Sequence, residues 1–365
     1  MPFPDVESLG YEEWLDNQIP NKSCIFSLFD KPRMYDIVGS RSCPYQCTFC
    51  YHHSPLYRQR FVKNIFLELR EVVKKHKINL LLFYDECLAI DKKRLKDICE
   101  GLKQLQGEIG WELKWIPNLR VDLVTDEILP MLKESNCAMI GYGFESYSAS
   151  VLKSMNKGII PQQIDTAIKK TLSAGIGLMG NFILGDIAET NETASTTLDY
   201  WDKCEDQISL DFVRPYPNSK LYQYCLKEGI IKDKLKFMKD IIKEDDFAIN
   251  MTKMSDSDFN KLKSRVQKSI SKHRKIAKNL SIKKISKGIY DITVKCPFCK
   301  GIITYGNCHI PNNYNYSFTA RCRKCPKRFY IASSLRKLAL RNYKIGKYIK
   351  NSSKRIFYLI KEKSI

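Results

Sequence analysis

Three cysteines stand close together in the first part of the chain, spaced four and three residues apart. They are Cys43, Cys47 and Cys50, and an aromatic residue, Phe49, directly precedes the last of them. Thiolates at this spacing hold metal, and three are one too few to complete the ligand set of a cubane iron–sulfur cluster. Such a cluster keeps one iron open to an outside ligand, as a catalytic zinc keeps one position free. The pattern therefore predicts a reactive iron–sulfur site, with a zinc site or three buried thiols as the alternatives.

A second group of cysteines consists of two pairs, each with two residues between its members. The pairs are Cys296 with Cys299 and Cys322 with Cys325, and 22 residues separate them. This arrangement is typical of a zinc ribbon, in which four thiolates close a tetrahedral site. Such a site is structural, and its metal folds a module too short to have a core of its own. Iron, alone or in an auxiliary cluster, is the alternative to Zn²⁺.

The composition indicates a globular protein with one large domain and a smaller module. The chain has 365 residues, 44% of them hydrophobic. Four acids lie within its first 14 residues. We therefore expect neither a leader nor a membrane span, which needs about 18 apolar residues, and we expect a cytoplasmic protein.

The net charge of +21 is unevenly distributed. Residues 261–287 hold eleven Lys or Arg and no acid, and residues 336–365 hold ten against the single Glu362. The first stretch also has helical apolar spacing over residues 261–280 and is interpreted as a charged surface helix or as a surface for phosphate-bearing partners. The second interleaves its cations with aromatic and aliphatic residues, which suits a solubilising tail, an anionic membrane surface or nucleic acid.

From residue 35 onward, apolar runs of strand length alternate with helical patterns. The predicted strands are 35–40, 79–84, 112–116, 138–143, 178–184 and 208–213, and the predicted helices are 59–76, 91–105, 161–174 and 190–203. This alternation predicts an α/β fold, a partial (β/α)6 TIM-like barrel, followed by a helical segment and a small zinc-ribbon-like module. We place an N-terminal arm at 1–34, the barrel at 35–235, a basic helical segment at 236–290, the four-cysteine module at 291–330 and a basic aromatic tail at 331–365.

Function in barrels of this shape lies at the carboxyl ends of the strands. The first predicted strand leads directly into the Cys43 loop, so the cluster is expected at that end. Polar residues and glycines follow the other five strands, as ordinary turns or as parts of a ligand site: Asp85 and Glu86, residues 117–120, Glu145 and Ser146, Gly185 and Asp186, and residues 214–217.

Together these motifs resemble the radical S-adenosylmethionine (SAM) enzymes. The cysteine spacing with Phe49 is accompanied, in order, by the runs 83–86, 118–122, 141–146, 152–158 and 215–219. Over residues 32–229 they look like the group whose members usually carry an N-terminal cobalamin-binding domain. No such domain is expected here, because the thirty-odd residues before the barrel are too few to form one.

The resemblance implies a [4Fe–4S] cluster at Cys43, Cys47 and Cys50 that cleaves SAM to a 5′-deoxyadenosyl radical. It further implies that Phe49 packs beside the SAM adenine, and that Asp85, with Glu86, binds the SAM amino group. Arg120 would lie near the carboxylate or ribose, and Glu145 with Ser146 would bind the ribose. Gly185 is also expected among the cofactor-binding residues. A flavodoxin or ferredoxin would supply the electron.

Three functions follow from these observations. The first is hydrogen-atom abstraction from a substrate that the sequence does not identify, in a pocket lined by Tyr51, His52, His53, Arg214 and Tyr216. The second is radical methyl transfer with cobalamin supplied in trans. The third is an RNA-binding or RNA-modifying protein that uses the basic C-terminal third. The apolar run 356–360 additionally predicts weak peripheral membrane association.

Overall fold

The structure, a computed structural model, describes residues 3–51, 56–204, 207–243, 248–312 and 314–342. Contacts within the chain divide it into two compact units. The first contains residues 1–18 and 32–262, and the second contains residues 19–31 and 263–365. Residues 19–31, which we assigned to an arm before the barrel, therefore group with the C-terminal module.

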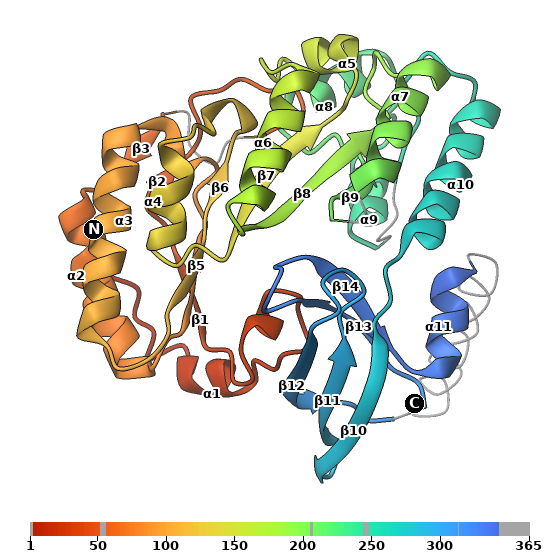
Figure 1. Ribbon diagram of the computed structural model, residues 1–365. Coiled ribbons are helices and arrows are strands. Elements are labelled where there is room, and N and C mark those ends of the chain that lie inside the picture. Colours follow the sequence, from red (N-terminus) through yellow and green to blue (C-terminus); the bar gives the residue numbers. More distant parts are fainter. Residues whose placement is uncertain (1–2, 52–55, 205–206, 244–247, 313, 343–365) are drawn as a thin grey trace. The chain divides into compact units, whose positions relative to one another are not determined.

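The first unit is built on six successive parallel strands (Figure 1). One ladder joins β1 (Met34–Ile37), β4 (Leu80–Phe83) and β5 (Lys114–Ile116), and a second joins β6 (Asn118–Leu119), β7 (Met139–Glu145), β8 (Gly177–Leu184) and β9 (Ser209–Phe212). The third predicted strand, 112–116, is found as β5, and Pro117, which has no N–H, separates it from two further strand residues, β6. The Gly141 amide donates to the Pro117 carbonyl at 2.9 Å and carries the pairing across the break. The predicted partial (β/α)6 barrel is thus confirmed.

Helices connect these strands and lie along the outside of the curved sheet (Figure 1). The four predicted helices are α2 (Val62–His76), α3 (Lys92–Glu108), α6 (Pro161–Ser173) and α7 (Asn191–Trp201). The first illustrates why they form, since Ile65, Leu69 and Val72 recur three and four residues apart and are all buried. The helices that the sequence analysis did not predict are α1 (Tyr11–Asp16), α4 (Ile128–Glu134), α5 (Ala149–Ser154), α8 (Lys220–Lys227) and α9 (Lys234–Lys243).

The core of the first unit lies between the sheet and these helices. Phe83 of β4 and Trp115 of β5 are almost fully buried and meet edge to face, with 5.5 Å between ring centroids. Six of the seven residues of β7 are buried, as expected for a central parallel strand covered on both faces. A short antiparallel ladder of β2 (Ser40–Arg41) and β3 (Arg58–Gln59) flanks the Cys43 loop on either side in the chain.

The second unit contains a three-stranded antiparallel sheet, β10 (Lys278–Ser286), β11 (Ile289–Lys295) and β12 (Ile302–His309), and a hairpin of β13 (Ser317–Arg321) and β14 (Arg328–Ala332). The helix α11 (Ser334–Arg341) follows. Ile292, Tyr305 and Phe329 are fully buried at the centre of the second unit. The predicted helix over 261–280 is wrong beyond His273, because α10 spans Asp256–His273 and β10 begins at Lys278. Ala277 and Leu280 continue the helical apolar spacing beyond His273. This stretch nevertheless forms a strand, because it pairs with β11.

Two predictions concern the membrane. No helix among the described residues is both long and apolar enough to cross a bilayer. The apolar run 356–360 of the tail lies outside the described residues, and peripheral membrane association stays a prediction.

Close packing of α3 against α2 makes one glycine indispensable. A Cβ on Gly101 would lie 2.4 Å from the Phe66 ring, whereas a Cβ on Gly107 of the same helix meets nothing within 4 Å. Gly101→Ala should therefore lower the free energy of unfolding by about 1–3 kcal/mol despite the better helix propensity of alanine. Gly107→Ala should raise it by up to about 1 kcal/mol. Urea denaturation measures both, and equal shifts in the same direction would contradict this packing.

Candidate functional site

The Cys43–Cys50 loop follows β1 and is fastened from two sides. The backbone N–H of Thr48 donates to the Met155 carbonyl at 3.0 Å, and its carbonyl accepts from the Leu221 N–H at 2.9 Å. The Asn156 side-chain amide donates to the Gln46 carbonyl at 2.8 Å. The loop has no regular structure to satisfy its backbone groups, so these bonds from the end of α5 and the start of α8 fix its course.

The three thiols of this loop differ in burial and in protonation. Cys47 is buried, and Cys43 and Cys50 are half-buried. A hydrogen bond from the Cys50 thiol, with the charge of Lys157 nearby, lowers the pKa of Cys47 to about 6. Burial raises the pKa of Cys43. One thiol is thus poised to ionise at neutral pH, as a metal ligand must.

A buried ion pair lies beside the thiols. Lys157 Nζ contacts Glu145 Oε1 at 2.6 Å, and the two residues are 8% and 5% exposed. The ammonium group also lies 5.9 Å from the centroid of the Phe49 ring. Gly143 leaves room for the pair, since a Cβ there would stand 2.2 Å from Glu145 Oε1 and 2.6 Å from Lys157 Nζ. Glu145 itself adopts φ = 61°, where the pairing of β7 with β8 shifts register.

Arg120 forms a second charged group at the same edge of the sheet. It is 6% exposed and binds both oxygens of Asp122, through Nε at 3.0 Å and Nη2 at 3.2 Å. Nη2 also donates to the Lys157 carbonyl at 2.7 Å. The guanidinium carbon stands 3.7 Å from the centroid of the Tyr45 ring, within the cysteine loop. Arg120 therefore links the third strand to both the loop and the Lys157 segment.

Asp85 and Glu86 follow β4 and have different surroundings. Asp85 is fully buried, and its two oxygens accept from the Gly39 N–H at 2.7 Å and from the Ser40 hydroxyl at 2.5 Å. The Arg94 guanidinium donates to the Gly39 carbonyl at 2.8 Å. Asp85 thus holds the turn that leads from β1 toward the cysteines. Glu86 is exposed. A contact of either carboxylate with the SAM amino group stays a prediction.

Ser146 is fully buried and faces other protein groups. Its hydroxyl lies 3.1 Å from the Thr197 hydroxyl and accepts from the Ser148 N–H at 3.1 Å. These bonds join the end of β7 to α5 and α7. A ribose contact from Ser146 stays a prediction. In the structure, Ser146 fixes the chain directly after Glu145 and so helps to position that carboxylate.

Gly185 ends β8 with φ = 93°, a conformation that favours glycine. Its N–H donates to the carboxylate of Glu189 at 3.3 Å, and the Thr193 hydroxyl donates to the same group at 2.5 Å. Burial raises the pKa of Glu189 to about 7. The neighbouring Asp186 is also fully buried and accepts from the Ala188 N–H at 2.9 Å.

The structure thus brings together Phe49, Arg120, Glu145 and the Cys43 loop, and it adds two residues to which the sequence analysis gave no role. Lys157 is the buried partner of Glu145, and Asp122 is the half-buried partner of Arg120. Both lie within the runs that carry the family resemblance, which was the only signal for them. Tyr51 and Tyr216 of the predicted substrate pocket approach within 6.0 Å between ring centroids, whereas His52 and His53 lie outside the described residues.

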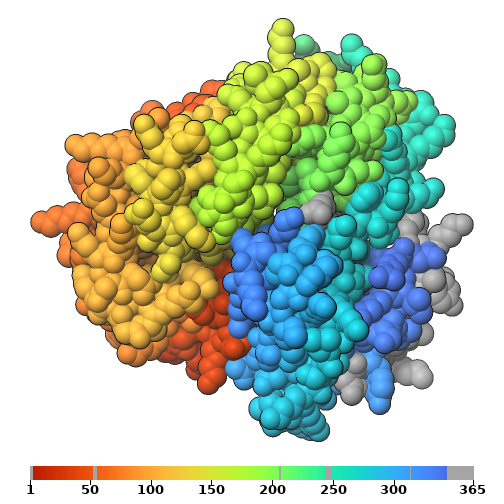
Figure 2. Space-filling view, in the orientation of Figure 1, coloured from red at the N-terminus to blue at the C-terminus, as the bar shows by residue number. Residues whose placement is uncertain are grey.

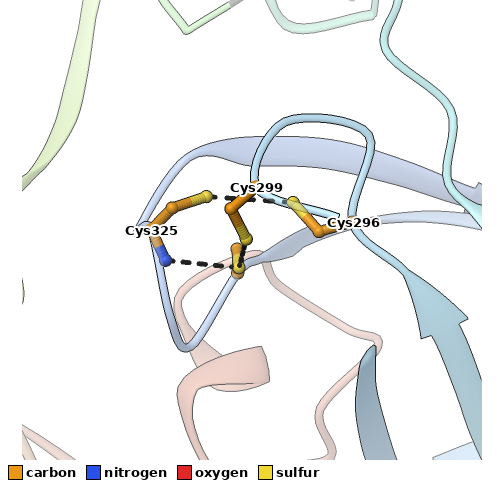
Figure 3. A group of neighbouring side chains, drawn as sticks. Cys296, Cys299 and Cys325 are labelled. Atoms are coloured by element: carbon orange, nitrogen blue, oxygen red, sulfur yellow. Dashed lines mark hydrogen bonds between the residues drawn. The ribbon is translucent and has the colours of Figure 1, made fainter. Parts of the chain in front are cut away.

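The second cysteine group converges on one point (Figure 3). The ligand atoms of Cys296, Cys299, Cys322 and Cys325 all lie within 4.8 Å of one another. Cys296 and Cys325 sulfurs are 3.8 Å apart, and Cys299 and Cys322 sulfurs are 3.7 Å apart. Four sulfurs that each lie about 2.3 Å from one tetrahedral ion are about 3.8 Å apart. The group therefore fits a single tetrahedral ion.

Residues 19–31 are fastened to this module beside the ligand Cys322. The Arg321 N–H donates to the Ser27 hydroxyl at 2.8 Å, and Arg323 Nε donates to the Ser27 carbonyl at 3.0 Å. Arg323 also pairs with Asp30 at 2.8 Å, and Asp30 accepts from the Gly306 N–H at 2.7 Å. The segment is thus tied to both sides of a metal ligand.

Comparison with known proteins finds a family match and relatives for the first unit. Residues 37–200 match the Radical SAM superfamily. An uncharacterized methyltransferase from Pyrococcus horikoshii is 29% identical over 199 residues, which cover 53% of this chain and 42% of that protein. An anaerobic magnesium-protoporphyrin IX monomethyl ester cyclase from Rubrivivax gelatinosus is 29% identical over 191 residues, covering 50% and 33%. The chain spans less than half the length of each.

Among solved structures, a radical SAM methyltransferase from Kitasatospora setae, with cobalamin and a [4Fe–4S] cluster bound, superimposes with a TM-score of 0.48 at 15% identity. The match covers 54% of this chain and 38% of that protein.

Breaking the buried pair should destabilise the first unit strongly. Lys157→Met leaves the Glu145 carboxylate buried without its cation, which should lower the free energy of unfolding by about 3 kcal/mol. The matched control is Lys170→Met, because Lys170 pairs with Asp126 at 2.8 Å on the surface. That change should cost less than about 1 kcal/mol. Urea denaturation compares them, and equal losses would mean that the Lys157–Glu145 pair contributes no more than a surface pair.

Metal removal should loosen the second unit where residues 19–31 are bound. Cys299→Ser should reduce metal content at this site, and chelation should speed tryptic cleavage after Lys22, because Arg321 and Arg323, which bind this segment, flank a ligand. The control is Cys204→Ser, since that half-buried thiol bonds to the Tyr200 carbonyl and belongs to neither cysteine group. Elemental analysis and timed proteolysis give the readouts. Unchanged cleavage after complete metal loss would show that the segment is held independently of the ion.

Proposed function

Residues 37–200 form a radical SAM domain, and on that premise we propose that this protein cleaves SAM reductively and abstracts a hydrogen atom from its substrate. The observation that carries the proposal is the placement of three thiols in one loop at the carboxyl end of β1, beside Arg120 and the Lys157–Glu145 pair. Function at this end of the strands is the rule for barrels of this shape.

The donor set fits a [4Fe–4S] cluster with one open iron. Cys43, Cys47 and Cys50 supply three sulfurs, and Cys47 ionises readily. When bound, the cluster and SAM supply a 5′-deoxyadenosyl radical, which is the chemistry of the cofactors. The loop supplies position, because Thr48 is fixed through both its N–H and its carbonyl. Phe49, next to Cys50, offers a ring face for the adenine.

The charged groups beside the loop match the charges of SAM. SAM carries an ammonium and a carboxylate on its methionyl part, and each is recognised by a group of opposite sign. Lys157 and Arg120 are buried cations whose charges act on Cys47, and Glu145 is the buried carboxylate paired with Lys157. We assign the SAM carboxylate to the cations and the ammonium or ribose to Glu145, with Glu86 as the exposed acid at the same edge.

We propose Zn²⁺ as the ion of the four-cysteine group, in a structural role. Four sulfurs at the spacing of one tetrahedral ion leave no position for a substrate. A cubane cluster needs a wider ligand set, because four irons lie between its thiolates. A single iron ion fits the same sulfurs, and metal analysis distinguishes the two.

Methyl transfer is the second candidate, favoured by the names of two relatives. The protein from Pyrococcus horikoshii is called a methyltransferase, and a hopanoid C-2 methylase from Rhodopseudomonas palustris is 24% identical over 203 residues, covering 53% of this chain and 38% of that protein. In this case cobalamin would come from solution or from another chain. S-adenosylhomocysteine, formed only when reduced cobalamin is added to accept the methyl group of SAM, would mark this reaction.

Anaerobic reconstitution tests the first candidate. The protein should bind about four irons at the Cys43 loop and, with dithionite, convert SAM to 5′-deoxyadenosine. Cys43→Ala should abolish both, while Cys204→Ala should change neither. Formation of no more 5′-deoxyadenosine by the cluster-loaded protein than by Cys43→Ala would refute the proposal. S-adenosylhomocysteine formed together with 5′-deoxyadenosine, and only when cobalamin is present, would favour methyl transfer.

A further inference from the structure

The C-terminal segment of the second unit, residues 263–342, carries charge of almost one sign. Residues 263–342 contain twenty Lys or Arg and a single acid, Asp291. Residues 1–262, in contrast, contain 34 Lys or Arg and 38 Asp or Glu. A solubilising surface normally mixes both signs, because opposite charges relieve mutual repulsion. A field of one sign attracts a polyanion.

Four of these cations lie on β10 and the turn after it, and we call them the β10 lysines. Lys278, Lys283 and Lys284 are exposed within the strand, and Lys287 is exposed directly behind it. None of the four forms an ion pair with another residue of the described chain. Even Asp291, which lies opposite Lys283 in the register with β11, instead accepts from the Asn307 N–H at 3.1 Å.

The position of β10 makes these lysines accessible together. β10 is the outer strand of its sheet and pairs only with β11, and eight of its nine residues are exposed. Figure 2 shows this part of the chain on the surface of the second unit. Successive side chains point to opposite faces of a strand, so Lys283 and Lys284 reach around the free edge from both sides. At about 3.3 Å per residue, the four span about 30 Å.

Two simpler roles do not account for this arrangement. Lysines on an edge strand prevent pairing with other chains, but that role needs one or two charges and leaves room for acids nearby. Cations also offset the negative charge of four thiolates on a divalent ion, and Arg323, Lys324 and Lys327 already lie next to the ligands in the chain. Neither edge protection nor charge balance at the four cysteines therefore requires the β10 lysines.

We propose that the β10 lysines bind the phosphate backbone of a nucleic acid. A nucleic acid strand presents charges continuously over about 30 Å and more, so one partner contacts all four lysines. A membrane suits the surface less well, because interfacial elements are amphipathic helices with Trp, Phe or Leu on one face, whereas β10 is a strand. Residues 263–342 contain no Trp, and the large apolar side chains exposed on β10 are Leu280, Ile282 and Ile285. This inference is independent of the radical chemistry proposed above.

The test measures binding of the full-length, metal-loaded protein to fluorescein-labelled oligo(U) RNA and oligo(dT) DNA by anisotropy. The variant Lys278→Gln/Lys283→Gln/Lys284→Gln/Lys287→Gln should bind at least about tenfold more weakly, with a log–log salt slope smaller by about 3. The matched control replaces four exposed lysines of the first unit, Lys63→Gln/Lys92→Gln/Lys93→Gln/Lys169→Gln, and should bind like the parent. Circular dichroism confirms that both variants fold.

Three outcomes would overturn the proposal. One is that the parent protein does not bind the oligonucleotides, or that the β10 variant binds them as tightly as the parent does. Another is competition by polyglutamate as effective as by oligo(U) at equal charge, which would indicate an acidic protein partner. The third is sedimentation with phosphatidylserine vesicles that depends on the β10 lysines when oligonucleotides do not bind, which would indicate a membrane. Stronger binding to RNA than to DNA, or the reverse, identifies the kind of nucleic acid.

Discussion

The geometry of the candidate site depends on three consecutive residues directly after α5. The Met155 carbonyl accepts from Thr48, the Asn156 amide donates to Gln46, and the Lys157 ammonium pairs with Glu145 beside the thiols. A loop without regular structure must have its backbone groups satisfied from outside. Here one segment supplies a carbonyl, an amide and a charge, so loop position and local electrostatics cannot vary independently.

The sequence predicted the barrel because its strands and helices are long and strongly patterned. It did not predict the further strand residues of β6 beyond Pro117, nor the end of α10 at His273, where the apolar spacing continues but pairing between β10 and β11 determines the structure. Cys43, Cys47 and Cys50 were found from spacing alone. Lys157 and Asp122 were not. Lys157 is buried by tertiary contacts, and only the fold brings it to Glu145, whereas Asp122 stands two residues from Arg120 without a pattern that marks the pair.

The two cysteine groups show how ligand spacing distinguishes two kinds of metal site. In the part of the chain that the structure describes, Cys296, Cys299, Cys322 and Cys325 form the only group of potential ligands packed within 4.8 Å. Backbone N–H groups of Lys324 and Cys325 point at the Cys322 sulfur at 3.4 and 3.3 Å, which suits a sulfur that carries negative charge. Cys43, Cys47 and Cys50 do not form such a group among the described residues.

The attachment of residues 19–31 to the second unit affects how the protein is made. Ser27 is synthesised early, but its partner Arg321 follows 294 residues later. Contacts so distant in sequence form late, because a long loop must close before they contribute. On the ribosome, the segment that precedes β1 therefore waits without its partners until almost the whole chain has emerged. The first unit must begin to fold while residues 19–31, which lie between two of its segments in the chain, still lack their partners.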